Sequence, residues 1–178
     1  LVSLYGSGQG TQMDSLRVAQ CATTRREVTY CTAKRNSLGC VPRIGFNGRP
    51  SATPPLLVND QFTVWCENVR NRKFGLLFYS VNTPPAAAPF QGATLCLSAP
   101  VKRTNAISSF GAPLPADDCS GRFSIHMNAW AHGTAGNPSP ALLVPGNTVN
   151  CQWWGRDPGY APPDDTQLSD ALNYEINP

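Results

Sequence analysis

Prolines and glycines divide this chain so finely that long helices have little room to form. The 178 residues include 17 prolines and 15 glycines, which are spread along the whole length. Proline inside a helix removes a hydrogen bond and clashes with the preceding turn, and glycine weakens helices and strands alike. The spacing therefore favours short strands joined by turns, and helical periodicity is weak throughout.

Short apolar segments with the pattern of strands lie between these prolines and glycines. The main ones are QFTVWCENV (61–69), FGLLFYS (74–80), RFSIHMNAW (122–130), NTVNCQWW (147–154) and LSDALNYEI (168–176). Shorter strands are expected at 26–31, 40–46 and 94–98, and NTPPAAAP (82–89) is expected to be a loop. Strands at this spacing predict an all-β fold, a two-sheet β-sandwich that is Ig-like or jelly-roll-like.

Alternation also predicts which side chains face the core. The inward sets are Phe62, Val64 and Cys66; Phe123, Ile125, Met127 and Ala129; Val149, Cys151 and Trp153; and Leu172, Tyr174 and Ile176. Segment 74–80 is apolar almost without a break, as expected for a strand buried on both faces.

Seven cysteines are dispersed along the chain, without a CxxC pair or the Cys/His spacing of a zinc site. They are Cys21, Cys31, Cys40, Cys66, Cys96, Cys119 and Cys151. In a charge-poor chain such cysteines indicate disulfides, so we predict a disulfide-stabilised protein that is secreted or at the cell surface. Because seven is odd, at least one thiol stays free or bonds to another chain. Cys66 and Cys151 are both expected to face the core, which suggests a cross-sheet disulfide between them.

The first twenty residues differ from the rest. LVSLY and SLRVAQ each have strand character, and a glycine-rich stretch separates them. We predict an N-terminal arm or edge strand over 1–20 and a β-sandwich domain over 21–178. Such an arm can add a strand to the sheet of a neighbouring molecule. No signal peptide is evident in LVSLYGSGQG, and no apolar run reaches the roughly 18 residues of a membrane span.

The C-terminal stretch QWWGRDPGYAPPDDTQLSDALNYEI (152–176) is rich in aspartate and supports two interpretations. The weak calcium candidates are Asp157, Asp164, Asp165 and Asp170, because calcium prefers oxygen ligands from acidic loops. The alternative, which we favour, is a structural clasp in which Arg156 binds a carboxylate, most simply that of Asp170. No other cofactor is expected.

No catalytic constellation is recognisable. The two histidines, His126 and His132, lie on a predicted strand face and in a loop, and no GxSxG motif is present. Cysteines that are expected to be oxidised do not suit a Cys/His dyad. The densest basic spots, Arg25–Arg26 and Arg70, Arg72 and Lys73, are interpreted as solvated loops and not as a nucleic-acid surface. We therefore predict a protein that is not an enzyme and does not bind nucleic acid.

Two tryptophans are expected to point away from the core. Trp65 lies on the outer face of its strand, and Trp154 follows the inward Trp153, so the two consecutive rings face opposite sides. An outward ring can stack on a sugar, fill an interface or lie under a local loop.

The order of several motifs from Tyr30 onward has a further implication. The motifs are YCTAKRNSLG (30–39), FGLLFYS (74–80), PFQGATLCL (89–97), GNTVNCQWWGRDP (146–158) and LSDAL (168–172). Together they resemble a β-rich domain that recurs, often C-terminally, in secreted and cell-surface proteins of planctomycetes and myxobacteria-like bacteria. The resemblance covers about residues 30–178 and implies an extracellular β-domain, in a family of unknown activity. Many members carry a cysteine near the C-terminus, whereas this chain ends YEINP, so no disulfide pairing is transferred.

These features lead to two functional expectations. The first is a non-enzymatic structural subunit of an extracellular fibre, surface layer or matrix, assembled through the N-terminal arm by self-association or with other surface proteins. The alternative is a carbohydrate-binding accessory module that uses the outward tryptophans on a polysaccharide. Fold alone does not decide between them, because function depends on the site.

Overall fold

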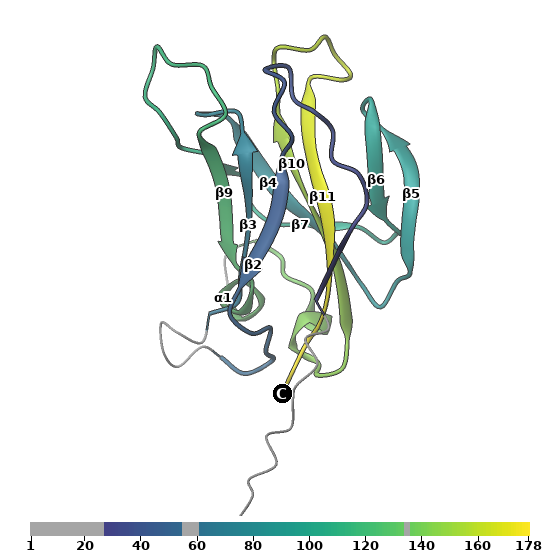
Figure 1. Ribbon diagram of the computed structural model, residues 1–178. Coiled ribbons are helices and arrows are strands. Elements are labelled where there is room, and N and C mark those ends of the chain that lie inside the picture. Colours follow the sequence, from purple (N-terminus) through teal and green to yellow (C-terminus); the bar gives the residue numbers. More distant parts are fainter. Residues whose placement is uncertain (1–26, 55–60, 134–135) are drawn as a thin grey trace, which may run out of the picture.

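The computed structural model describes residues 27–54, 61–133 and 136–178, which form a mostly β structure (Figure 1). The predicted arm over 1–20 and Cys21 lie outside the described residues. The elements are β1 (Val28–Tyr30), β2 (Arg43–Asn47), β3 (Thr63–Val69), β4 (Phe74–Val81), β5 (Pro85–Phe90), β6 (Ala93–Leu97), β7 (Lys102–Arg103), β8 (Ile107–Ser108), β9 (Gly121–His126), α1 (Met127–His132), η2 (Pro140–Leu143), β10 (Thr148–Arg156) and β11 (Thr166–Glu175).

The strands form two facing sheets and one extra hairpin. The larger sheet has the order β1-β11-β10-β4-β7, with β8 also paired to β4, and the smaller sheet has the order β2-β3-β9. All of these pairs are antiparallel. The β5–β6 hairpin is a separate sheet beside β11, on the side away from β9 (Figure 1). The all-β sandwich predicted from the sequence is confirmed.

The core lies between the two sheets and contains most of the side chains that alternation assigned to it. Phe62, Val64 and Cys66 are fully buried, and so are Val149, Cys151 and Leu172. In the middle of the core the rings of Phe123 and Trp153 stack with their centroids 5.4 Å apart. Alternation identified these residues correctly because each strand has one face against the opposite sheet.

Two predicted elements were wrong. Segment 122–130 is not one strand, because β9 ends at His126 and α1 follows. In that helix Met127, Trp130 and Ala131 are buried, which is the i, i+3, i+4 spacing of an amphipathic helix. The expected loop at 82–89 contains most of β5, a strand of a two-stranded sheet, where proline is tolerated.

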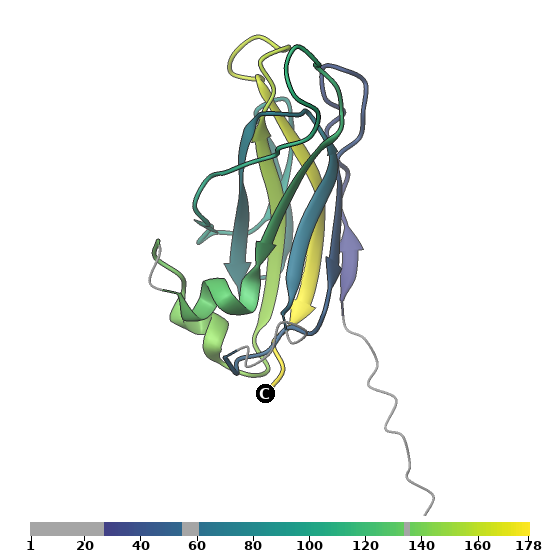
Figure 2. The same cartoon turned by 90° about the vertical axis from the view of Figure 1, so that its left-hand side faces the viewer.

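The connecting loops gather at one end of the sandwich, which we call the loop end. It consists of loops 31–42, 70–73, 110–120 and 157–165 (top of Figure 1). The C-terminus, α1 and η2 lie at the opposite end, as the view from the side of the smaller sheet also shows (Figure 2). The loop end is therefore where loops distant in sequence meet.

Candidate functional site

A buried arginine joins three loops of the loop end. Arg70 donates from Nη1 to Asp157 Oδ1 at 2.8 Å and to Ser37 Oγ at 2.9 Å, and from Nη2 to both carboxylate oxygens of Asp117. Asp157 is fully buried and also accepts from the backbone N–H of Ser37 at 2.7 Å. Burial raises the pKa of Asp157, but hydrogen bonds from Ser37 and Arg70 outweigh it and hold the pKa below its usual value. The interpretation of Arg70 as a solvated loop residue was wrong, since its charge is paired inside the protein.

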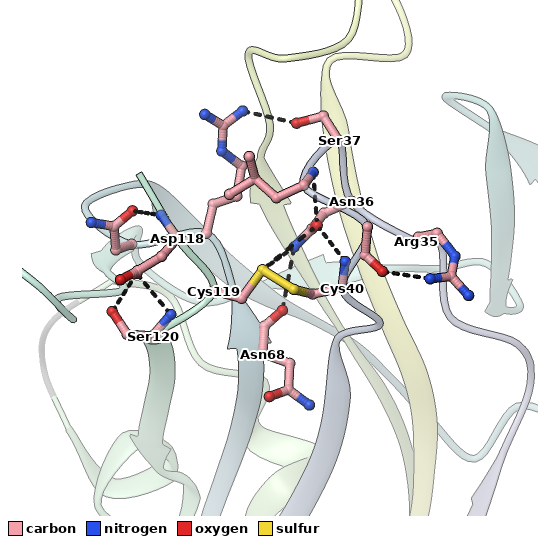
Figure 3. Close-up of a disulfide and its surroundings, with 12 residues drawn as sticks. Arg35, Asn36, Ser37, Cys40, Asn68, Asp118, Cys119 and Ser120 are labelled. Atoms are coloured by element: carbon pink, nitrogen blue, oxygen red, sulfur yellow. Dashed lines mark hydrogen bonds between the residues drawn. A yellow bond between two sulfur atoms is a disulfide. The ribbon is translucent and has the colours of Figure 1, made fainter. Parts of the chain in front are cut away.

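A disulfide secures the same end of the molecule (Figure 3). Cys40 and Cys119 are bonded, with their Cα atoms 6.5 Å apart, and join loop 31–42 to loop 110–120. The buried side chain of Asn36 shapes the turn beside the bond: Oδ1 accepts from the N–H groups of Leu38 and Cys40, and Nδ2 donates to the carbonyl of Asn68. Side-chain amides commonly stabilise turns in this way.

The motif residues behind the resemblance have structural partners in this chain. Gln152 accepts from the N–H of Cys96 at 2.9 Å and donates to the carbonyls of Ser169 at 2.8 Å and Thr94 at 3.1 Å. It thereby holds the β5–β6 hairpin against the larger sheet. The Ser169 hydroxyl accepts from the N–H of Trp153 at 3.0 Å, beside the register shift between β10 and β11. Buried polar groups of this kind satisfy main-chain hydrogen bonds.

The predicted clasp between Arg156 and Asp170 was wrong. Arg156 binds Asp165 at 2.8 Å, whereas Asp170 accepts from the backbone N–H of Ile44 at 2.7 Å. Arg156 lies on the outer face of its sheet near Trp154, and Asp170 points to the smaller sheet. Residues on opposite faces of one sheet cannot pair.

The four aspartates proposed for calcium are not brought together. Asp157 is bound to Arg70, Asp165 to Arg156, and Asp170 to Ile44. Asp164 is exposed beside Gly92, in another part of the loop. Within the described residues, no group of three or more His, Cys, Asp or Glu side chains has an arrangement that could hold a metal ion.

The expected Cys66–Cys151 disulfide was also wrong. Both residues are buried free thiols, and the bonded pairs are Cys31–Cys96 and Cys40–Cys119. Facing sheets lie about 10 Å apart, whereas a disulfide needs Cα atoms within roughly 7 Å. Two inward cysteines on opposite sheets can therefore share a core without being within bonding reach.

Trp65 lies on the outer face of the smaller sheet, as alternation predicted. Its ring covers Gly45 on the neighbouring strand, at a distance that leaves no room for a Cβ atom there. The guanidinium of Arg122 lies over the ring, 4.5 Å from a ring centroid. The ring is partly buried by these contacts within the chain.

Trp154 is covered locally, which is one of the alternatives left open by the sequence. Its Nε1 donates to Gln91 Oε1 in the β5–β6 turn at 2.7 Å, and Phe78 lies 6.4 Å from it between ring centroids. A role of Trp65 or Trp154 in glycan binding stays a prediction.

A cleft of about 470 Å³ opens beside the β5–β6 turn, and we call it the Tyr160 cleft. Its walls come from three separate segments of the chain. They are Thr32, Ala33, Lys34 and Arg35; Gly92, Ala93 and Thr94; and Tyr160 with Asp164. The cleft could not be predicted from the sequence, because no local motif links residues so far apart.

Comparison with known proteins finds no matching family model, no similar curated protein and no similar solved structure. The resemblance to the planctomycete and myxobacteria-like domain therefore stays a prediction. Among the described helices none has the length and apolar character needed to cross a membrane.

Proposed function

We propose that this chain is a non-enzymatic structural subunit of an extracellular fibre, surface layer or matrix. Two disulfides support an oxidising compartment, in which such bonds form and persist. The buried charges at the loop end are paired with one another, which suits a rigid scaffold.

The observation that carries this proposal is the outer edge of β1, which is unpaired among the described residues. Edge strands of soluble proteins are usually blocked, and two of the edges here are. The N–H of Ile44 in β2 donates to Asp170, and the N–H of Arg122 in β9 donates to the carbonyl of Ser109 at 2.7 Å. In contrast, β1 pairs with β11 on one side, and its outer edge has no backbone partner among the described residues.

An open edge accepts a strand from another molecule by main-chain hydrogen bonding. Val28 on β1 is 57% exposed, and this three-residue strand contains neither lysine nor proline. The first twenty residues contain the strand-like stretches LVSLY and SLRVAQ. We assign them as the donor strand of a neighbouring subunit, and a head-to-tail contact that does not close produces a filament.

The test is electron microscopy of the purified chain and of two variants. Deletion of residues 1–20 removes the donor, and Val28→Lys places a charge on the acceptor edge. Both variants should remain folded by circular dichroism and lose the polymers that the full chain forms.

Val101→Lys is the matched control, because Val101 is also an exposed valine, 37% accessible, and lies outside β1. This variant should polymerise like the full chain. A full chain that stays monomeric, or polymers that persist after both changes, would refute the proposal.

A further inference from the structure

The walls of the Tyr160 cleft are joined to one another by contacts of Lys34 and Tyr160. Lys34 Nζ donates to the carbonyls of Gln91 at 2.8 Å and Asp164 at 2.6 Å, and it lies 4.9 Å from the ring centroid of Tyr160. The Tyr160 hydroxyl donates to the carbonyl of Arg35 at 3.1 Å. The charge of Lys34 is therefore used to join all three walls.

Two further bonds hold the first wall to the body of the sandwich. The backbone N–H of Lys34 donates to the carbonyl of Leu168 in β11 at 2.9 Å. The Cys31–Cys96 disulfide links the start of the same wall to β6. A site whose walls are already in place loses less entropy when it binds a ligand.

The groups left at the cleft surface include both acceptors and donors. The Asp164 carboxylate is exposed and accepts no hydrogen bond from the described residues. It lies against Gly92, where a Cβ atom would be only 2.8 Å from the Cγ of Asp164. Glycine at this position therefore lets the β5–β6 turn lie close to Asp164. Arg35 uses one terminal nitrogen on the carbonyl of Gly39, which leaves other N–H donors of its guanidinium for a ligand.

We propose that the Tyr160 cleft binds a neutral saccharide. A sugar presents neighbouring hydroxyls that donate and accept, and an apolar face of C–H groups that packs on an aromatic ring. Asp164 supplies the acceptor, Arg35 the donors, and the partly exposed Tyr160 the ring. Asp164 disfavours an anionic ligand and Arg35 a cationic one, which selects a neutral molecule. The volume of about 470 Å³ lies within the range of roughly 300–1,000 Å³ typical of small-molecule sites.

This activity goes beyond the proposed assembly and uses different residues, since β1 and the arm do not line the cleft. A fibre or matrix subunit with such a cleft attaches to polysaccharide while it polymerises. Loss of either activity leaves the other measurable.

The test is NMR titration of the isotope-labelled chain, with its disulfides intact and residues 1–20 retained, at a concentration below that of assembly. The probes are cellohexaose, chitohexaose and a galacturonic acid hexamer. One of the two neutral probes should shift the amides of residues 32–35, 92–94 and 160–164. Asp164→Asn should weaken this binding about tenfold, because a charged acceptor is exchanged for a weaker neutral one.

Two further variants separate a ligand site from a merely structural cleft. Tyr160→Ala should lose more affinity than Tyr160→Phe, since only the former removes the ring. Glu67→Gln is the matched control for Asp164→Asn, because Glu67 is a carboxylate on β3, outside the cleft. It should bind the saccharide like the unmodified chain.

Three results would overturn the proposal. The first is that neither neutral hexasaccharide shifts the cleft amides. The second is that the shifts surround Trp65 and disappear in Trp65→Ala but not in Asp164→Asn. The third is that only the galacturonic acid hexamer binds and that Asp164→Asn strengthens its binding.

Discussion

Asp170 occupies a position where an acceptor is needed but a negative charge is unfavourable. Its carboxylate accepts from the N–H of Ile44 and so blocks the edge of β2. Burial raises the pKa of Asp170, and the hydrogen bond from Ile44 and the charge of Arg43 only partly oppose this. The folded state therefore favours the protonated form more than the unfolded chain does, in which an aspartate has a pKa of about 3.9. The stabilising contribution of the protonated form is complete below that value and is lost as the pH rises through the folded-state pKa.

We therefore expect Asp170→Asn to keep the hydrogen bond to Ile44 and to remove the pH dependence that Asp170 gives to the free energy of unfolding. At pH 7 its free energy of unfolding should equal or exceed that of the unmodified chain, and near pH 3 the two should converge. Urea unfolding at both pH values measures the difference.

Asp170→Ala provides the comparison, because it removes charge and acceptor together. It leaves the Ile44 N–H without its partner, so its free energy of unfolding should be about 1–2 kcal/mol lower than that of Asp170→Asn at both pH values. If the asparagine variant is less stable than the alanine variant at pH 7, the role given to the hydrogen bond is incorrect.

The contacts between particular residues of different loops were the least predictable part of the site. Alternation shows which face of a strand a side chain occupies, but not which residue of another loop lies opposite. Arg70 and Asp157 are 87 positions apart, and nothing local marks them as partners. The same limit explains the errors at Arg156 and at Cys66, where the face or the residue type was right and the partner was not.

At the scale of elements, the β5–β6 hairpin depends on attachments to the rest of the fold. An isolated two-stranded hairpin is marginally stable in water. Here the Cys31–Cys96 disulfide, the hydrogen bonds of Gln152 and the edge-to-face contact of Phe90 with Phe78 hold it against the larger sheet. We therefore expect the order of the hairpin to depend on these attachments, the disulfide among them.

Replacing Cys31 and Cys96 together by serine should release this hairpin before the sandwich unfolds. Backbone amides of residues 85–97 should exchange with solvent faster, while those of β10 and β11 keep their protection. Hydrogen-exchange mass spectrometry resolves the two regions, and the overall loss of stability should be about 2–4 kcal/mol.

The double variant of Cys40 and Cys119 is the matched control, because its disulfide joins two loops at the loop end. In this variant the backbone amides of the β5–β6 hairpin should exchange with solvent at the same rate as in the unmodified chain. Equal acceleration in both double variants would mean that the hairpin has no independent stability.

Strands could be predicted from sequence wherever two sheets impose an inside and an outside. The stretches that became β3, β10 and β11 show this alternation clearly. The strand β5, with sequence PAAAPF, has two prolines and no β-branched residue, so its pattern could not be distinguished from a loop. Met127 continues the alternation of β9 but begins a helix, and the change of period appears only at Trp130 and Ala131.

At the scale of the whole molecule, the cysteine count has a consequence for assembly. Four cysteines form disulfides and two are buried thiols within the described part of the chain. Of the seven cysteines, only Cys21 lies outside it, in the segment between the predicted arm and β1. Under the proposed function, we expect Cys21 to link subunits covalently in pairs, because one thiol per chain forms one intermolecular disulfide.

Cys21→Ser polymers should therefore form normally and separate in denaturant directly into monomers. Without reductant, denaturant should separate the unmodified polymers into disulfide-bonded dimers, and adding reductant should convert these dimers into monomers. A gel run with and without reductant measures this directly. Crosslinked species that persist in the variant would exclude Cys21 as the linking residue.

The fold class was predictable because it follows from bulk features that no single partner controls. Proline and glycine spacing excluded long helices, and dispersed cysteines indicated disulfides. The Tyr160 cleft was not predictable, because it exists only where loop 31–42, the β5–β6 turn and loop 157–165 converge.

The two core thiols also bear on how the chain matures. Burial raises the pKa of Cys66 and of Cys151, and disulfide exchange requires the thiolate, so neither reacts readily once the sheets have packed. A newly made chain, in contrast, exposes every thiol to oxidation and to wrong partners. Collapse of the sandwich before oxidation would therefore protect Cys66 and Cys151 from wrong disulfides, and we expect the yield of correctly paired protein to depend on the order of these two events during biosynthesis.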